Sequence, residues 1–351
     1  MADAPRPFAD RPLAQLVLAR IREYYREPEA LFWTFVFPLL MAAGLAVAFR
    51  SRPPEVPSIG VVAGPEADSL VAALTADSAF RAVVLDDSTG LRRLTTGKVA
   101  ILVRQRADSV EYQYDPTRPE GLAARRAVDD ALQRGAGRTD PIPVREQAVT
   151  ERGSRYIDFL IPGLLGMSLM SNSMWGIGYG VVDQRRRKLL RRFVATPMSR
   201  STYLASFAIA RLTVLPLEAG FLVTIGALVF GVPVRGSLVT LGLVCLLSTV
   251  SFGGLGLLIA ARPKTVEAAG GLMNFAMLPM WVLSGVFFSS DNFPAAVQPL
   301  IKALPLTAAN DALRATMLDG AGLLQIAPSL GVLAIWLVLS FPLAVRIFRW
   351  N

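Results

Sequence analysis

Six stretches of the chain are long, apolar and almost free of charge. They cover residues 30–49, 159–182, 201–234, 236–261, 268–290 and 320–345. A bilayer core of about 30 Å is crossed by roughly 20 helical residues, so each stretch is long enough to span a membrane. The third carries Arg211 and Glu218, and the other five carry no charged side chain. The pattern predicts six transmembrane helices.

The basic residues of the short connecting segments favour one orientation. Residues 183–200 hold seven basic side chains against one acid. The segment between the fourth and fifth spans adds Arg262 and Lys264, and the C-terminus adds Arg346 and Arg349. Short cytoplasmic segments of membrane proteins are enriched in Lys and Arg. With six spans these segments share one side, so we predict that they and both termini are cytoplasmic.

Residues 51–155 have the pattern of a separate domain. Their 15 basic and 15 acidic residues cancel, so the net charge of +9 belongs to the rest of the chain. Residues 59–63, 82–85, 99–103 and 110–114 indicate strands, and residues 66–76 and 119–134 indicate helices. This order is typical of a small α/β domain. We find no catalytic constellation in it and interpret it as a structural cap or a substrate-access module.

Residues 8–26 have the spacing of an amphipathic helix. The residues that recur every three or four positions are Leu13, Leu16, Val17, Arg20, Ile21 and Tyr24, and positive charge comes from Arg11, Arg20, Arg22 and Arg26. Such a helix lies in the headgroup plane of a membrane, and a solvated leader is the alternative. The apolar run that follows lacks a small-residue cleavage site, so we expect a retained span rather than a signal peptide.

Composition narrows the chemistry. Charged residues make up 18% of the chain and hydrophobic residues 53%, against about 25% charge in an ordinary soluble domain. The chain has no histidine, which excludes Ser-His-Asp catalysis and histidine-ligated metals. Its single cysteine, Cys245, cannot form an internal disulfide, and there is no G-x-x-x-x-G-K-[ST] phosphate loop. We therefore predict no enzymatic activity in this chain. The basic surplus reflects membrane topology, so we predict no nucleic-acid partner.

Residues 183–200 combine positive charge with an apolar stripe. Leu189, Leu190, Phe193 and Val194 lie between basic residues, and Pro197 ends any helix that precedes it. A short helix with two such faces can dock into a groove on a soluble partner. Anionic-lipid binding alone is the alternative interpretation.

Two sequence blocks resemble a known family. The first is RRFVATPMSR at residues 191–200, directly after the second span. The second comprises Phe293-Pro294, Leu304-Pro305-Leu306-Thr307 and Asp311-Ala312-Leu313-Arg314, before the last span. In order and spacing they resemble the permeases of type-two ABC exporters, in which a leucine-rich basic helix ends in a Thr-Pro turn. The resemblance covers nearly the whole chain and points to the branch with an extracytoplasmic domain between the first two spans.

The resemblance implies an all-α polytopic membrane protein with six transmembrane helices and a small extracytoplasmic α/β domain between helices one and two. The implied parts are a cytoplasmic tail with an interfacial helix (1–27), a first span (28–50), the α/β domain (51–155) and the remaining spans (156–351). The last part would include a cytoplasmic coupling helix (183–200) and an outer re-entrant or interfacial segment (291–319).

The resemblance also implies partners. Such permeases pair with a second copy or a paralogue and bind two cytoplasmic ABC ATPase subunits, which hold ATP and magnesium; no cofactor is expected in this chain. The residues implied in coupling to the ATPase are Arg185, Arg186, Arg187, Leu189, Leu190, Arg191, Arg192, Phe193, Thr196 and Pro197. Residues 13–26 would make a second cytoplasmic contact. Many members carry a Glu-rich stretch where this chain has Arg186, Arg187 and Lys188, so acidic coupling contacts do not transfer.

Polar positions inside the spans suggest a substrate path. Arg211 and Glu218 lie two helical turns apart on one face, either in that path or as a structural pair with the second span. Gly176 and Gly180 form a small-xxx-small pair that allows close helix approach. In the family the cavity lies between the second and fifth spans. The residues expected to line it are Asn172, Trp175, Glu218, Asn274, Met277 and Trp281, with ordinary packing as the alternative for each.

The leading hypothesis is the permease subunit of an ATP-driven exporter in a bacterial cytoplasmic membrane, moving a lipid-like or drug-like compound by alternating access. One alternative is an ion-coupled secondary transporter that uses Arg211 and Glu218. Such folds usually show internal repeats, and none is clear between the two halves. Another is a non-transporting scaffold or sensor, which would need a larger cytoplasmic domain.

Overall fold

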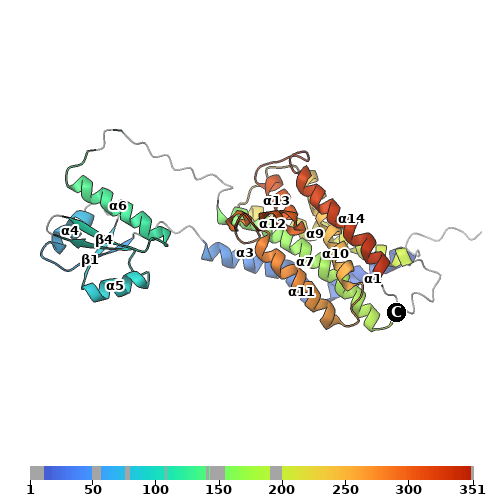
Figure 1. Cartoon of the computed structure of the whole chain (residues 1–351). Coiled ribbons are helices and arrows are strands. Elements are labelled where there is room, and N and C mark those ends of the chain that lie inside the picture. Colours follow the sequence, from blue (N-terminus) through green and yellow to red (C-terminus); the bar gives the residue numbers. More distant parts are fainter. Residues whose placement is uncertain are drawn as a thin grey trace, which may run out of the picture. The chain divides into compact units, whose positions relative to one another are not determined.

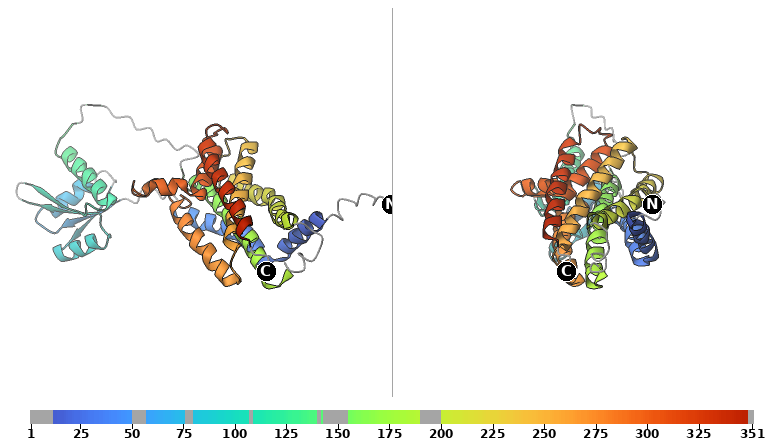
Figure 2. Two further views of the ribbon diagram at one scale, coloured as in Figure 1. Left: turned by 45° about the vertical axis from the view of Figure 1, so that its right-hand side comes forward. Right: turned by 90° about the vertical axis from the view of Figure 1, so that its right-hand side faces the viewer.

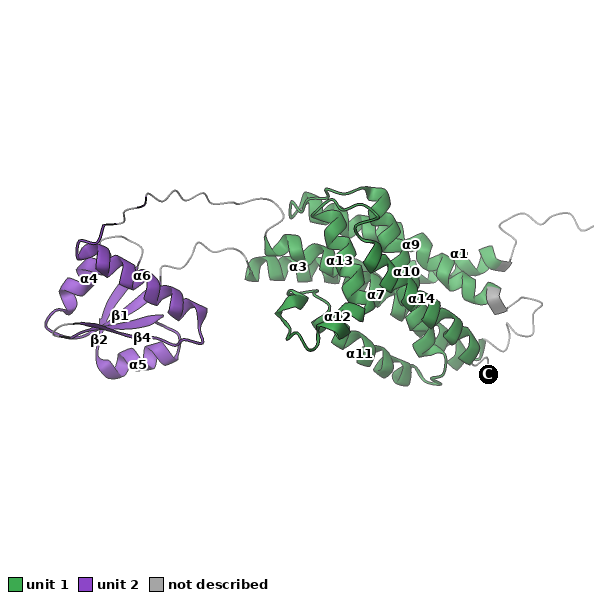
Figure 3. Cartoon of the chain, turned by 45° about the horizontal axis from the view of Figure 1, so that its top comes forward, with its two compact units in different colours: residues 1–50, 150–351 green, residues 51–149 purple. Residues whose placement is uncertain are grey.

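The computed structural model describes residues 12–49, 57–75, 80–106, 109–139, 142, 155–189 and 200–348. The chain divides into two compact units (Figure 3). Unit 1 comprises residues 1–50 and 150–351, and unit 2 comprises residues 51–149.

Unit 1 is a helical bundle (Figure 1). Its described elements are α1 (Pro12–Arg26), α2 (Pro28–Leu31), the π-helix η2 (Phe32–Val36), α3 (Phe37–Ala48), α7 (Tyr156–Arg186), α9 (Arg200–Leu228), α10 (Leu238–Ala260), α11 (Val266–Leu283), the 3-10 helix η3 (Ser290–Asn292), α12 (Gln298–Ala303), α13 (Pro305–Met317) and α14 (Ala327–Ile347). Of the described residues, five helical segments are long and apolar enough to cross a membrane: Pro28–Ala48, Thr202–Leu228, Leu238–Ala260, Val266–Leu283 and Ala327–Ile347. The chain is therefore a multi-pass membrane protein.

Helix α7, which corresponds to the predicted second span, is not among these five segments. It has 31 residues, but glycine, serine and asparagine make it less apolar than the helices of the five segments. The structure supplies the reason: α7 packs against α3, α9, α10, α11 and α13, and most of its side chains are buried. A helix surrounded by protein does not need the apolar surface that lipid requires.

Glycines set the close contact between α7 and α10. A Cβ atom on Gly256 would lie 2.7 Å from the carbonyl oxygen of Met174, and one on Gly178 would lie 3.0 Å from the carbonyl oxygen of Gly256. The backbones approach so closely that no side chain fits between them. Of the predicted pair, Gly180 lies against Phe207 of α9, whereas Gly176 has no neighbour within 4 Å among the described residues.

The two ends of unit 1 can be told apart by α7. At its first turn the Tyr156 hydroxyl donates to the carbonyl of Phe287 at 2.9 Å, and the Phe49 ring, just after α3, lies 4.4 Å from the Tyr156 ring. We call this the α13 end, because α13 contacts α7 there. Phe49 and Arg155, the described residues of unit 1 that flank unit 2 in the sequence, both lie at the α13 end. The opposite end, where Arg185 meets Phe348, is the Arg185 end. Helix α14, drawn in red, ends there (Figure 2).

Two spans have shorter helices than their apolar runs suggest. Helix α11 ends at Leu283 rather than near residue 290, because Gly285 takes a left-handed conformation (φ +71°) and turns the chain. Helix α14 begins at Ala327, after a second left-handed glycine at Gly320. Between them, α13 is largely buried against α7, α10 and α14.

Unit 2 contains a four-stranded sheet of order β2-β1-β3-β4. Strand β1 (Ser58–Val62) pairs in parallel with β2 (Arg81–Leu85) and β3 (Ile101–Gln105), and β4 (Val110–Gln113) is antiparallel to β3. Helices α4 (Ala67–Thr75) and α6 (Pro119–Gly135) cover one face, where Ile59, Val61, Ile101 and Val103 are buried. Helix α5 (Asp87–Thr95), which the sequence pattern did not predict, covers part of the other face (Figure 3).

Candidate transport and coupling sites

A buried cluster joins α7 to α9. Arg211 and Glu218 are 8% and 2% exposed. One amino group of the Arg211 guanidinium donates to a Glu218 oxygen, and the Asn172 side-chain amide donates to the other oxygen. The Arg211 Nε donates to the Ser173 hydroxyl at 3.3 Å. Both carboxylate oxygens are therefore engaged, and the two charges neutralise each other.

This pairing explains how two charges persist within a candidate span. An isolated charge at the centre of a bilayer costs about 2.5–3.5 kcal/mol on insertion scales. Here each charge faces its partner, and residues of α7 supply further hydrogen bonds. The arrangement matches the structural pair with the second span, which was one of the two interpretations of the sequence.

The six expected path residues do not share one cavity in this structure. Asn172 and Glu218 belong to the buried cluster, and Met277 is 1% exposed inside the bundle. Trp175 and Trp281 are half-buried, with the Trp175 ring packed over Gly270. Asn274 is exposed on α11.

Asn274 lies on a face of α11 that is otherwise apolar and open. Its large exposed side chains are Leu272, Phe275, Leu278 and Val282. Phe275 is 81% exposed. This face is not covered by the described residues of the chain.

Arg185 lies at the opposite end of α7 from the first turn and is buried. Its guanidinium donates to the carbonyl oxygens of Ala260 and Pro263 at 3.0 and 2.6 Å, and to that of Ala261 at 3.2 Å. These carbonyls belong to the end of α10 and the turn after it, where a helix leaves acceptors without partners and carries partial negative charge. Arg185 therefore fastens α7 to α10 instead of facing outward.

The next two arginines are placed differently. The side chains of Arg186 and Arg187 are 57% and 64% exposed, and their guanidinium groups lie 3.6 and 2.7 Å from Asp183. Lys188 then takes a left-handed conformation (φ +59°) and ends α7. Leu189 is the last described residue before the gap. The other expected coupling residues lie outside the described residues: Leu190, Arg191, Arg192, Phe193, Thr196 and Pro197.

Helix α1 docks on α9 near the Arg185 end. The half-buried positions of α1 include the apolar stripe of the sequence, Leu13, Leu16, Val17, Ile21 and Tyr24. From the same stripe, Arg20 donates to the Ser206 hydroxyl at 2.9 Å and lies 3.1 Å from the centre of the Phe207 ring. Burial lowers the pKa of Arg20 from its ordinary value.

This docking connects α1 to the last turns of α7. The guanidinium of Arg20 also lies 5.4 Å from the Tyr203 ring, and the Tyr203 hydroxyl donates to the Gln184 side chain at 2.7 Å. Gln184 directly precedes the basic residues at the end of α7. The start of α9 thus contacts both α1 and the end of α7.

At the α13 end a second arginine joins three elements. Arg314 of α13 donates to the carbonyls of Phe159 (3.3 Å) and Gly285, and its guanidinium lies 3.7 Å from the Phe159 ring. Asn310, one turn earlier, donates to the Ser284 carbonyl at 2.8 Å. These bonds hold α13 against the start of α7 and the end of α11.

Within the described ranges no group of three or more His, Cys, Asp or Glu side chains is placed to hold a metal ion. The candidate sites in the described part of the chain are a buried ion pair, an exposed basic end of α7 and an open apolar face of α11.

Comparisons with known proteins give part-length matches. The chain is 28% identical over 158 residues to the inner membrane transport permease YadH of Escherichia coli, covering 44% of this chain and 60% of that protein. It is 27% identical over 148 residues to the probable multidrug ABC transporter permease YbhS of the same species, covering 42% and 39%. A 100-residue segment is 30% identical to nodulation protein J of Rhizobium leguminosarum, covering 28% and 38%.

A family-level comparison covers far more of the chain. Residues 28–346 match the family described as ABC-2 family transporter protein. The match includes the candidate spans, unit 2 and both ends of the bundle described above. It agrees with the resemblance seen in residues 191–200 and in the blocks before the last span. The chain therefore belongs to the ABC-2 family of transporter proteins.

Proposed function

We propose that this chain is the membrane-embedded subunit of an ATP-binding-cassette exporter in a bacterial cytoplasmic membrane. It would move a hydrophobic or amphipathic compound by alternating access, driven by a separate ATPase. The observation that carries the proposal is the family match over residues 28–346. The names of the relatives, permeases of transport and multidrug systems, support it.

We further propose that α7 is a sixth span. At about 1.5 Å per residue, its 31 residues are about 46 Å long, which exceeds the hydrocarbon thickness of about 30 Å. With six spans, the Arg185 end faces the cytoplasm, because the described basic residues Arg186, Arg187, Arg262 and Lys264 lie at that end. Unit 2, joined at the α13 end, would then be extracytoplasmic.

The exposed arginines at the end of α7 are the proposed start of the ATPase contact. Arg186 and Arg187 keep their guanidinium groups accessible although both lie near the buried Asp183, because their side chains are 57% and 64% exposed. Arg185 has a different role: it transmits movement of this end to α10 through three carbonyl contacts. Helix α1 would contribute through Arg20 and Tyr203.

The open apolar face of α11 supports a second copy or a paralogue as partner. Exposed apolar faces of this kind mark interaction surfaces or lipid contacts. A cavity formed between two copies along this face would place Asn274 and Trp281 beside the substrate.

The test needs a partner ABC ATPase, which is sought first among the genes adjacent to this one. Co-expressed with the full chain, the ATPase should co-purify with it, and export of a hydrophobic dye from vesicles should require ATP. Charge reversal at Arg186 and Arg187 (Arg186→Glu with Arg187→Glu) should lower co-purification and transport. Arg262→Glu is the matched control, because Arg262 is exposed at the same end in another loop. If the chain purifies intact and binds no ATPase, the proposal is wrong.

The ion-coupled alternative makes the opposite prediction. Transport would survive ATP depletion and stop when the ion gradient collapses. No described contact favours this alternative, because Arg211 and Glu218 are occupied by each other and by α7.

A further inference from the structure

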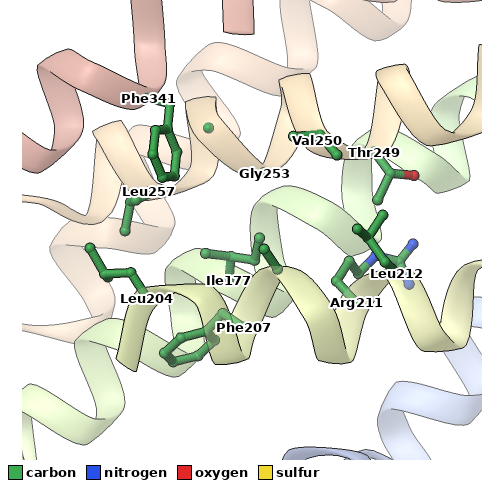
Figure 4. A pocket seen from close by; sticks show the side chains of 12 residues that line it. Ile177, Leu204, Phe207, Arg211, Leu212, Thr249, Val250, Gly253, Leu257 and Phe341 are labelled. Carbon is green, nitrogen blue, oxygen red and sulfur yellow. The ribbon is translucent and has the colours of Figure 1, made fainter. Parts of the chain in front are cut away.

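A small hollow lies between α9, α10 and α14, with α7 behind it (Figure 4). Its cavity volume is about 40 Å³, and it is partly open to one side. Ten of its twelve lining residues have apolar side chains or none. The two exceptions are Arg211 and Thr249, which lie together at one end (Figure 4).

The open side of the hollow faces the region where lipid would lie. Its half-exposed lining residues come from three helices: Ala208 and Leu212 of α9, Val250 of α10, and Phe341 of α14, which is 43% exposed. Helices α9, α10 and α14 are all long and apolar enough to cross a membrane. Because water is scarce in the hydrocarbon region, whatever fills the hollow must be mainly apolar.

At the polar end of the hollow, the Thr249 hydroxyl and one nitrogen of the Arg211 guanidinium make no hydrogen bond to the described residues, although Arg211 is otherwise bonded to Ser173 and Glu218. Thr249 is 1% exposed, and its hydroxyl has no hydrogen-bond partner among the described residues. The hydrogen bonds of Arg211 use its Nε and Nη2 atoms, so within the described part of the chain Nη1 keeps its hydrogens available. Buried polar groups are normally satisfied, so this pair calls for a molecule that supplies an acceptor.

The charge around Arg211 indicates which acceptor fits. Glu218 already neutralises the Arg211 guanidinium. A ligand carboxylate at the same place would lie close to the Glu218 carboxylate and be repelled by it. A neutral oxygen can accept from Nη1 and bond the Thr249 hydroxyl without adding charge. The acceptor is therefore a hydroxyl, carbonyl or ether oxygen.

We propose that this hollow binds a hydrophobic molecule that carries a neutral acceptor oxygen and arrives from within the bilayer. Only the oxygen-bearing end of the molecule enters the hollow, where it meets Thr249 and Arg211. The apolar part lies outside, along the lining residues of the open side, Leu212, Val250 and Phe341. The binding itself is independent of transport. Its use as an access site for exported cargo rests on the function proposed above.

The test compares two probes on the full chain in lipid nanodiscs without ATP. One probe is a clickable diazirine fatty alcohol, and the other is the matching diazirine alkane of equal length. Mapping of cross-linked peptides should show that the alcohol labels residues 204–212 and 249–257 roughly two- to tenfold more than the alkane, the effect of about one hydrogen bond.

Three variants separate the causes. Thr249→Val should reduce labelling by the alcohol to that of the alkane, and Thr249→Ser should restore it. Ala208→Phe, or Ala208→Leu if the first does not fold, fills the hollow and should reduce labelling by both probes. Ile209→Phe, next in sequence and 39% exposed, is the matched control and should change neither.

Equal labelling by the two probes, or no effect of Thr249→Val in a correctly folded variant, would overturn the proposal and leave the hollow as a space filled by ordinary acyl chains. Because no ATPase takes part, this result is distinct from a failure of the transport proposal.

Discussion

Replacement of Glu218 by Gln tests whether the buried ion pair holds α7 to α9. Glutamine keeps the shape of the side chain and can still accept from Asn172, so the main loss is the negative charge opposite Arg211. Removing one partner of a buried pair costs about 3–5 kcal/mol, and an unpaired charge in a bilayer costs about 2.5–3.5 kcal/mol. We expect a loss near 3 kcal/mol, or roughly 6–12 °C in apparent Tm for a unit of this size.

The assay is thermal unfolding of the full chain in nanodiscs, followed for Glu218→Gln, Arg211→Gln and the double variant. Because removing both charges leaves no unpaired charge, the double variant should be destabilised much less than the sum of the single variants. Thr213→Val is the control, since Thr213 is exposed on the same helix and its hydroxyl donates to the Ile209 carbonyl one turn earlier. If the single effects add to within about 0.5 kcal/mol of the double variant, the two charges do not interact and the reasoning is wrong.

Three further predictions follow from named contacts. Gly256→Leu should prevent the bundle from folding, because the Cβ atom of the new side chain would lie 2.7 Å from the backbone of Met174. Gly242→Leu on the same helix should be tolerated, because a Cβ atom there has no described neighbour within 4 Å. The monodisperse fraction after purification measures the effect of each variant. Arg20→Ala should release α1 from Ser206 and Phe207, seen as faster hydrogen exchange in α1 and unchanged exchange in α10. Hydrogen bonds from Ser88 and Thr89 lower the pKa of Asp86, the N-cap of α5, to about 2. The stability that the ionised Asp86 adds to α5 should therefore be lost as the pH falls from about 4 to about 2. Asp86→Asn should remove this pH dependence from the hydrogen exchange of α5, and a dependence that persists would contradict the assignment.

The sequence identified features that depend on local periodicity. The stripe of α1 from Leu13 to Tyr24 was visible because apolar residues recur at helical spacing, and the structure turns these positions toward α9. The sequence could not predict the surface against which this stripe packs, because an interfacial helix and a helix docked on protein share the same pattern. The strands of unit 2 were found from short apolar runs. Helix α5 was missed because only nine residues form it, with two arginines and few apolar positions.

Other features depend on contacts between distant residues. Nothing in the arginine run distinguishes Arg185, which meets the end of α10 some 75 residues later, from the exposed Arg186 and Arg187. The glycine spacing in α7 pointed to Gly176 and Gly180, whereas the closest contact with α10 uses Gly178, because the partner helix decides which face is buried. The pairing of Arg211 with Glu218 was one of two interpretations, and only the position of Asn172 on the neighbouring helix gives its geometry.

The stacking of Phe49 on Tyr156, with ring centres 4.4 Å apart, brings together the two places where the chain leaves the bundle and returns to it. The hundred or so residues between them therefore form an inserted domain that can be deleted or replaced without changing the helices of unit 1. A short glycine bridge across this junction should yield a trimmed permease with its helices in the same order. Foreign domains of similar size could be grafted at the same point.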